Sequence, residues 1–371
     1  MFTLQIENYK CFKESQPVAI NDLTVLAGQN SVGKSSIIQS LLLLHLGVQL
    51  KDVGQMYVNS PELSLELGTA SELPNMDSGS EKFTIGLYDD DSGASNVVEF
   101  EVPDDEDLWS SLIIKALYLE GETEEGIEAL SRQEFYYLAS ERLGPRISTT
   151  MGNLLFRNTG CRGEFSAQVL GEREGRIKVE KLRLYPGTTN PNLEAQVNYW
   201  LNSIIPGTTV TTINNRSSLQ QQIVMRRGNT NVKATNVGFG ISYILPVIIT
   251  CLIGRKGSFV LIDTPEAHLH PTAQTALGEF IARMSMTGLR IVVETHSEHV
   301  IDGMKLYASE FKENRGRISI NFLSSTEDGV LVVKTINFTE DFKYDAYPRG
   351  FMDQSVRDFH RQREILQNQV L

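Results

Sequence analysis

A glycine-rich loop between a buried strand and an apolar helix constrains this chain more than any other feature of its sequence. The segment Gly28-Gln29-Asn30-Ser31-Val32-Gly33-Lys34-Ser35 fits the pattern G-x-x-x-x-G-K-S. Residues 23–27 form an apolar run typical of a buried strand, and residues 35–46 are apolar enough for a buried helix. Backbone N–H groups in such a loop, with the helix N-terminus, bind phosphate. The sequence therefore predicts an α/β sheet with a phosphate site at its edge.

The loop predicts the residues that hold a nucleotide. Lys34 is expected to reach the β- and γ-phosphates, and Ser35 is expected to hold Mg²⁺. ATP and Mg²⁺ are accordingly the expected cofactors. The full set expected to bind the nucleotide from this segment is Gly28, Asn30, Ser31, Gly33, Lys34, Ser35 and Ser36.

The last third of the chain alternates helical and strand patterns, which indicates a sheet with much parallel pairing. The expected helices are 242–253, 272–284 and 298–306, and the expected strands are 259–262, 290–293, 318–322 and 330–336. Asp263 ends one strand, where an acidic partner of the Mg²⁺ is needed. His296 follows another strand, within Glu294-Thr295-His296-Ser297.

The order of these motifs resembles the ABC-type ATPase heads of the RecF/SMC group. It resembles most closely the bacterial OLD-like ATPases, AAA-type ABC proteins found in anti-phage defence and DNA-repair settings. The segments that carry the resemblance are residues 6–13 with 23–28, 265–271, 294–297 and the tail 347–353. The resemblance implies a P-loop NTPase fold with an ABC-type head, in which a mixed sheet and helices accompany an antiparallel β lobe.

The resemblance also implies a mode of assembly. Two nucleotides would be sandwiched in a head-to-tail dimer, with a signature segment of each chain facing the nucleotide of the other. Residues 236–243 occupy the signature position, so Gly240 and Ser242 are expected to meet the partner's γ-phosphate. The alternative is a glycine turn followed by Ser242 as a helix N-cap.

The same resemblance implies catalytic roles for Asp263, Glu266 and His296. One position departs from the usual pattern of ABC-type heads. Thr264 stands where most ABC heads carry a catalytic Glu, and a threonine cannot act as a general base at neutral pH. Either Glu266 orients the attacking water, or hydrolysis is slow and the protein is mainly an ATP-gated clamp. Near the expected Q-loop, Glu141 or Arg142 either senses the nucleotide or forms a surface ion pair.

Charge divides the chain unevenly. Residues 52–141 contain 22 acidic and 3 basic residues, whereas residues 142–233 contain 13 basic and 5 acidic ones. The net charge of -12 argues against indiscriminate coating of nucleic acid, while the basic stretch leaves a local DNA-binding face open, with Arg226 and Arg227 as candidates. The alternative is that both stretches are ordinary solvated surface. The expected domains are an N-terminal ATPase lobe (1–146), an inserted basic subdomain (147–235) and a C-terminal ATPase lobe (236–371).

Several classes of protein are excluded or disfavoured. No apolar run is long enough to span a bilayer, the start lacks a signal peptide, and three scattered cysteines fit a cytoplasmic protein without membrane partners. About 75 residues follow His296, too few for the Toprim nuclease domain of OLD proteins, so we expect an effector such as a nuclease on another chain. The remaining alternatives are a scaffold that binds ATP without useful turnover and a small-molecule kinase.

Overall fold

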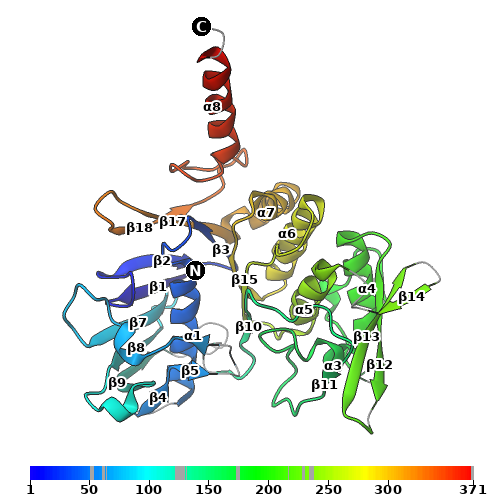
Figure 1. The fold of residues 1–371 in the computed structure, drawn as a ribbon, viewed down its shortest axis with the longest axis horizontal. Helices are drawn as coiled ribbons and strands as arrows, with labels where there is room; N and C mark the ends of the chain where they lie inside the picture. Colours follow the sequence, from blue (N-terminus) through cyan, green and yellow to red (C-terminus); the bar gives the residue numbers. More distant parts are fainter. Residues whose placement is uncertain are drawn as a thin grey trace.

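The central sheet, drawn in Figure 1, brings the glycine-rich loop, Asp263 and residues 294–297 to one edge. Its strand order is β10-β15-β16-β3-β17-β18, with β18 antiparallel and the other neighbours parallel. Parallel strands end at the same edge, so the residues that follow β3, β15 and β16 become neighbours. The strands are β10 (Tyr136–Leu138), β15 (Phe259–Asp263), β16 (Arg290–Glu294), β3 (Leu23–Gly28), β17 (Ile318–Ser325) and β18 (Leu331–Ile336).

These observations come from a computed structural model. The structure describes residues 1–50, 54–60, 63, 65–121, 130, 132–172, 176–215, 217–227, 230–233 and 238–368.

An antiparallel β lobe, built from the N-terminal part of the chain, lies at one end of the molecule (Figure 1). Its strand order is β2-β1-β7-β8-β9-β4. The helix α1 (Lys34–Leu50) contacts strands of this lobe and of the central sheet, so it is buried on all sides, which explains its apolar sequence. The sequence of residues 83–88 and 97–102, joined by an acidic turn, predicts a β-pair, and the structure confirms it as β7 and β8. The strands are β2 (Gln16–Ile20), β1 (Phe2–Glu7), β7 (Lys82–Asp89), β8 (Ser95–Glu101), β9 (Ser111–Glu120) and β4 (Gln55–Tyr57).

A small third sheet lies at the opposite end of the molecule (Figure 1). It is accompanied by α3 (Ser166–Leu170) and α4 (Leu193–Ile204), whose Val169 and Trp200 belong to the same buried cluster as Val260 of the central sheet. The expected subdomain 147–235 therefore packs into the core of the ATPase lobe. The strands are β11 (Thr149–Thr150), β13 (Gln220–Arg227), β12 (Thr209–Asn215) and β14 (Thr230–Lys233). A separate two-stranded pair, β5 (Asn59–Ser60) and β6 (Leu65–Glu66), lies near the β lobe.

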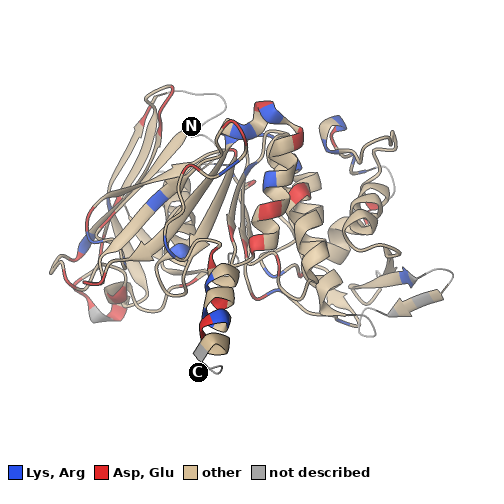
Figure 2. Cartoon of the chain, turned by 90° about the horizontal axis from the view of Figure 1, so that it is seen from above, with Lys and Arg blue, Asp and Glu red and all other residues tan. Residues whose placement is uncertain are grey.

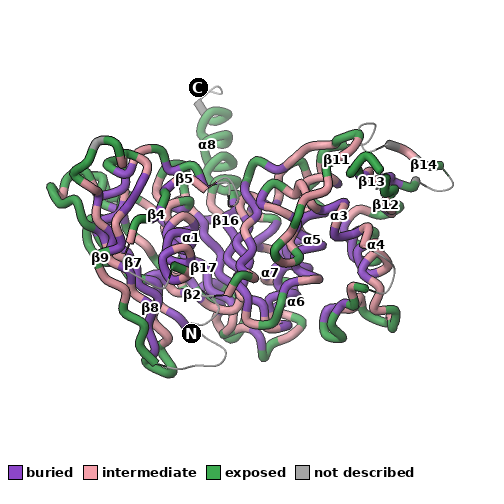
Figure 3. Tube along the Cα trace, turned by 90° about the horizontal axis from the view of Figure 1, so that it is seen from below, coloured by how far each residue is buried: buried purple, intermediate pink, exposed green. Residues whose placement is uncertain are grey.

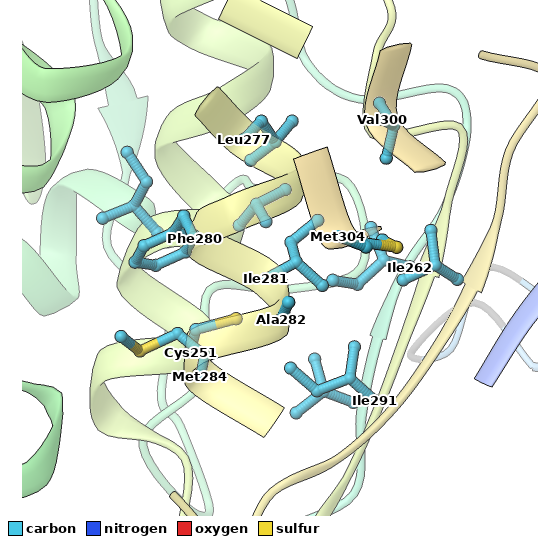
Figure 4. Close-up of a cluster of buried hydrophobic side chains, with 14 of the residues drawn as sticks. Cys251, Ile262, Leu277, Phe280, Ile281, Ala282, Met284, Ile291, Val300 and Met304 are labelled. Carbon is cyan, nitrogen blue, oxygen red and sulfur yellow. The ribbon is translucent and has the colours of Figure 1, made fainter. Parts of the chain in front are cut away.

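Three helices cover the central sheet: α5 (Phe239–Ile253), α6 (Pro271–Ser285) and α7 (Glu298–Glu310). Figure 4 shows apolar side chains of these helices packed together with Ile262 and Ile291 of the sheet. Figure 3 shows that the buried residues run through the interior of the molecule. The helix expected at 242–253 begins earlier, at Phe239, with Gly238 as its N-cap. Ser242 is therefore inside the helix, and the alternative that it is an N-cap is wrong.

The last helix, α8 (Gln354–Asn368), stands away from the body (Figure 1). The amphipathic pattern of residues 355–367 predicts a helix that docks on the body, but residues 354–367 are all exposed, so this docking is not observed. None of the described helices has the length and apolarity needed to cross a membrane.

The basic stretch contributes less surface charge than its composition suggests. Arg142 and Arg183 are fully buried, and Arg162 pairs with Glu141 at 2.6 Å. Basic residues stand at separated positions in Figure 2. Arg226 is exposed on β13, whereas the side chain of Arg227 lies outside the described part of the structure.

We predict that Gly303→Ala destabilises the fold by about 1–3 kcal/mol. A Cβ at Gly303 in α7 would meet the carbonyl oxygen of Thr275 in α6, and the two helix backbones leave no room for it. Helix propensity alone would give the opposite sign, since alanine is favoured over glycine. Urea unfolding measures the change. Gly316→Ala is the control because nothing lies near its Cβ, and equal stabilities for both variants would contradict the prediction.

Candidate nucleotide site

The loop between β3 and α1 requires its two motif glycines. Gly28 has φ 141° and Gly33 has φ 105°, both in the region that favours glycine. A Cβ at Gly28 would also meet the carbonyl oxygen of Leu323, and one at Gly33 would meet the sulfur of Cys11. The loop conformation and the close packing under it therefore explain both positions.

A cavity of about 430 Å³ opens beside this loop. Lys34, which is 3% exposed, donates hydrogen bonds to the carbonyl oxygens of Gly28 (3.1 Å) and Gln29 (2.5 Å). Burial lowers the pKa of Lys34, although nearby carboxylates oppose the shift. No carboxylate in the described part of the chain pairs with this ammonium, so it is available to an anion. The cavity is lined by Lys10, Cys11, Asn30, Ser31, Gly33, Lys34, Ser35, Ser36, Gln39, Glu294 and His296.

The carboxylate nearest the loop is Glu294, not Asp263. Asp263 is expected to reach the Mg²⁺ shell through water or Ser35, but Ser35 Oγ lies 3.0 and 3.2 Å from the two carboxylate oxygens of Glu294 instead. The cause is the strand order, because β16 lies between β3 and β15. Burial, with the neighbouring charge of Asp263, raises the pKa of Glu294 to about 7.

Glu266 and His296 are brought together, as the sequence predicts. One carboxylate oxygen of Glu266 accepts a hydrogen bond from the backbone N–H of His296 at 2.8 Å, and the other accepts one from Thr295 Oγ1 at 2.8 Å. The His296 side chain is exposed and lines the cavity. The part of the imidazole that is buried lowers the pKa of His296, and the positive charge of Lys34 lowers it further by a smaller amount. Both effects favour the neutral imidazole.

The backbone turn after β15 is strained, and the buried side chain of Arg142 holds it from the protein interior. Thr264 has φ 47°, unusual for a β-branched residue, and its hydroxyl donates to Asp263 Oδ1 at 2.7 Å. The buried Arg142 guanidinium donates to the carbonyl oxygens of Asp263 (2.8 Å) and Thr264 (2.6 Å). Burial lowers the pKa of Arg142 to about 10.

This arrangement decides the alternatives at the expected Q-loop. Arg142 braces the turn from the protein interior, and Glu141 forms an exposed ion pair with Arg162. Neither side chain lines the nucleotide cavity. The structure therefore favours the ion-pair alternative for Glu141 and gives Arg142 a bracing role that the sequence did not suggest.

The signature residues lie elsewhere in the molecule. Gly240 and Ser242 are in the first turn of α5, and neither lines the cavity beside the loop of the same chain. A Cβ at Gly240 would lie 2.8 Å from the carbonyl oxygen of His268, so close packing explains this glycine. Asn236 and Val237, the start of the signature segment, lie outside the described residues.

Four lining residues were not predicted: Lys10, Cys11, Gln39 and Glu294. Lys10 Nζ donates to Gln39 Oε1 at 2.6 Å, which joins the opening segment to α1. Glu294 had a signal in the sequence, since it directly follows the predicted strand 290–293 and directly precedes Thr295-His296. The position of β16 within the sheet, which gives Glu294 its importance, is not visible in the sequence.

The oxygen donors at this site suit Mg²⁺. The Ser35 hydroxyl and the Glu294 carboxylate are hard ligands, and Mg²⁺ in proteins commonly takes one or two carboxylates together with substrate phosphates and water. Among the described residues, no group of three His, Cys, Asp or Glu side chains forms a site that could hold a metal ion alone. The residues therefore fit an Mg²⁺ ion that arrives with the phosphates of a nucleotide.

We predict that Arg142→Ala lowers the free energy of unfolding by about 1–3 kcal/mol or more, because it leaves buried carbonyl oxygens without a donor. Thermal or urea unfolding measures the loss. Glu141→Ala is the matched control, since an exposed ion pair contributes less than about 1 kcal/mol. A stable Arg142→Ala protein, indistinguishable from this control, would show that the brace is unimportant.

Comparison with known proteins supports this assignment of the fold. Residues 1–130 match a family model described as AAA ATPase domain. Residues 163–302 match one described as AAA domain, putative AbiEii toxin, Type IV TA system. No curated protein matches the sequence.

Two solved SMC heads align over nearly the whole chain. The SMC head bound to the C-winged helix domain of ScpA covers 91% of this chain and 98% of its own, with 13% identity and a TM-score of 0.54. The SMC head with an extended coiled coil, bound to the C-terminal domain of ScpA derived from Pyrococcus furiosus, covers 91% and 97%, with 12% identity and a TM-score of 0.55. The chain therefore has the fold of a P-loop ATPase head of the ABC type, and two parts of its sequence match AAA-type ATPase domains.

Proposed function

We propose that this chain binds Mg²⁺–ATP beside the loop at residues 28–35 and hydrolyses it. The observation that carries the proposal is the position of Glu266, whose carboxylate does not line the cavity itself but is held by Thr295 and His296 at the strand end that borders it. A phosphate-binding loop alone would serve a kinase or a passive binder. A carboxylate and a histidine at the adjacent strand end supply what hydrolysis requires in addition.

Each residue has a distinct role in this proposal. Lys34 and the N-terminus of α1 neutralise the phosphates, and Mg²⁺, when bound, neutralises further charge on the same oxygens. Glu266 positions the attacking water, and His296 contacts the γ-phosphate. The neutral imidazole favoured by burial donates one N–H hydrogen bond to that phosphate.

The proposed assembly is a head-to-tail dimer in which Gly240 and Ser242 meet the nucleotide of the partner chain. Their location away from the loop of their own chain supports this arrangement. ATP binding would close the dimer and hydrolysis would reopen it. The solved SMC heads bind ScpA, another protein chain, and one matching family model is described as a putative toxin. We therefore propose an OLD-like role in which the switch controls an effector such as a nuclease, in anti-phage defence or DNA maintenance.

One observation favours a second candidate function, an ATP-gated scaffold with little turnover. Thr264 replaces the usual catalytic Glu, and its hydroxyl is engaged with Asp263. Both oxygens of Glu266 are also engaged in hydrogen bonds within the chain.

Direct DNA binding is a further proposal, for which the exposed Arg226 on β13 is the candidate contact among the described residues.

We predict that Lys34→Ala raises the Kd for a labelled, non-hydrolysable ATP analogue at least about 30-fold. Removing a buried charged partner costs about 2 kcal/mol or more, and each 1.4 kcal/mol is tenfold in affinity. Fluorescence anisotropy of the analogue measures the change. The exposed Lys13→Ala variant is the control. Equal affinities for the two variants would remove the loop from the proposed function.

We predict that Glu266→Gln lowers the steady rate of phosphate release by roughly 100- to 10,000-fold, the usual contribution of a general base. ATP binding by the variant should persist. The exposed Glu310→Gln variant, with the same loss of charge, should release phosphate at the wild-type rate. If wild type holds ATP without releasing phosphate, the scaffold is the correct function.

A further inference from the structure

Glu294 occupies a position between the phosphate-binding loop and the conventional acidic strand end. Its neighbours in the sheet are Asp263 of β15 on one side and Leu26 of β3 on the other. It lines the cavity beside the loop, whereas Asp263 does not. Of these two carboxylates, the one that borders the cavity is therefore the one at the end of β16.

The hydrogen bonding of Glu294 leaves it incompletely satisfied. An ionised carboxylate has about four lone-pair sites, and the Ser35 hydroxyl has one proton to donate. Ser35 is the side-chain partner of Glu294 in the described part of the chain. Glu294 is 4% exposed, so water replaces these missing partners only through the cavity.

The charge around Glu294 is only partly compensated. No Lys or Arg in the described ranges lies within ion-pair distance of Glu294, Asp263 or Glu266. The positive charge of Lys34 acts on Glu294 from farther away, and the negative charges of Asp263 and Glu266 oppose it. The buried Arg142 guanidinium donates to backbone carbonyls instead. A buried carboxylate without a close counter-charge is costly, and a cation on the cavity side would relieve that cost.

We infer that Glu294 is the protein carboxylate that holds Mg²⁺ together with Ser35 when a nucleotide is bound. This inference rests on the proposed function and names a residue that the motifs do not. Ser35 and Glu294 share a hydrogen bond, so two of the oxygen ligands are already adjacent. Asp263, one strand further from the loop, acts through Glu294 and the surrounding water.

The experiment titrates Mg²⁺ into the full chain mixed with mant-labelled AMP-PNP and follows nucleotide fluorescence, so that no turnover is needed. For Glu294→Gln the Mg²⁺ concentration at half-saturation should rise roughly 10- to 100-fold, as for loss of a residue that supports a metal site. Nucleotide binding without Mg²⁺ should be unchanged or tighter, because a negative charge near the phosphates has been removed.

The matched control is Glu298→Gln, the same substitution four residues later in α7, which should keep the wild-type midpoint. An unchanged midpoint in Glu294→Gln would overturn the inference. Should that variant not fold, Glu294→Asp decides: its shorter carboxylate should raise the midpoint, and a wild-type value would overturn the assignment. If wild type binds no nucleotide at all, the proposed function fails, an outcome distinct from binding that ignores Glu294.

Discussion

The parallel register of β3, β16 and β15 is the constraint on which the nucleotide site depends. It places the ends of the three strands side by side, so the loop after β3, Glu294 at the end of β16 and Asp263 at the end of β15 form one row. The loop and Asp263 therefore end up in the same row of the sheet although they are far apart in the sequence. The helix α1 between the two sheets and the helices α5 to α7 over the central one pack against the strands that carry this row.

The strained turn after β15 connects the core to the chemistry. Thr264 is kept at a positive φ because Arg142 binds its carbonyl oxygen and that of Asp263. Glu266, two residues later, then reaches Thr295 and His296. Local strain of this kind persists only where the surroundings enforce it, and it is concentrated at functional sites. A turn braced by a buried guanidinium suits the proposed site, in which Glu266 positions the attacking water.

Much of the fold was accessible from the sequence, because the motifs carry their own structural context. The alternation of the last third predicted α5 to α7 with β15 to β18, and the loop predicted Lys34 and Ser35 at the cavity. The roles of Glu294 and Arg142 were missed because they come from sheet order and from burial under a distant turn, respectively. The isolated α8 shows the converse, since its amphipathic pattern predicted a contact that the exposed residues 354–367 do not make.

The most direct test of the account is isothermal titration calorimetry of the wild-type chain with a non-hydrolysable ATP analogue, in the presence of Mg²⁺ and again with the metal chelated. The account predicts saturable binding of one nucleotide per chain that tightens when Mg²⁺ is present, because the Ser35–Glu294 pair faces the phosphates. Absence of binding, or an affinity that Mg²⁺ leaves unchanged, would contradict it.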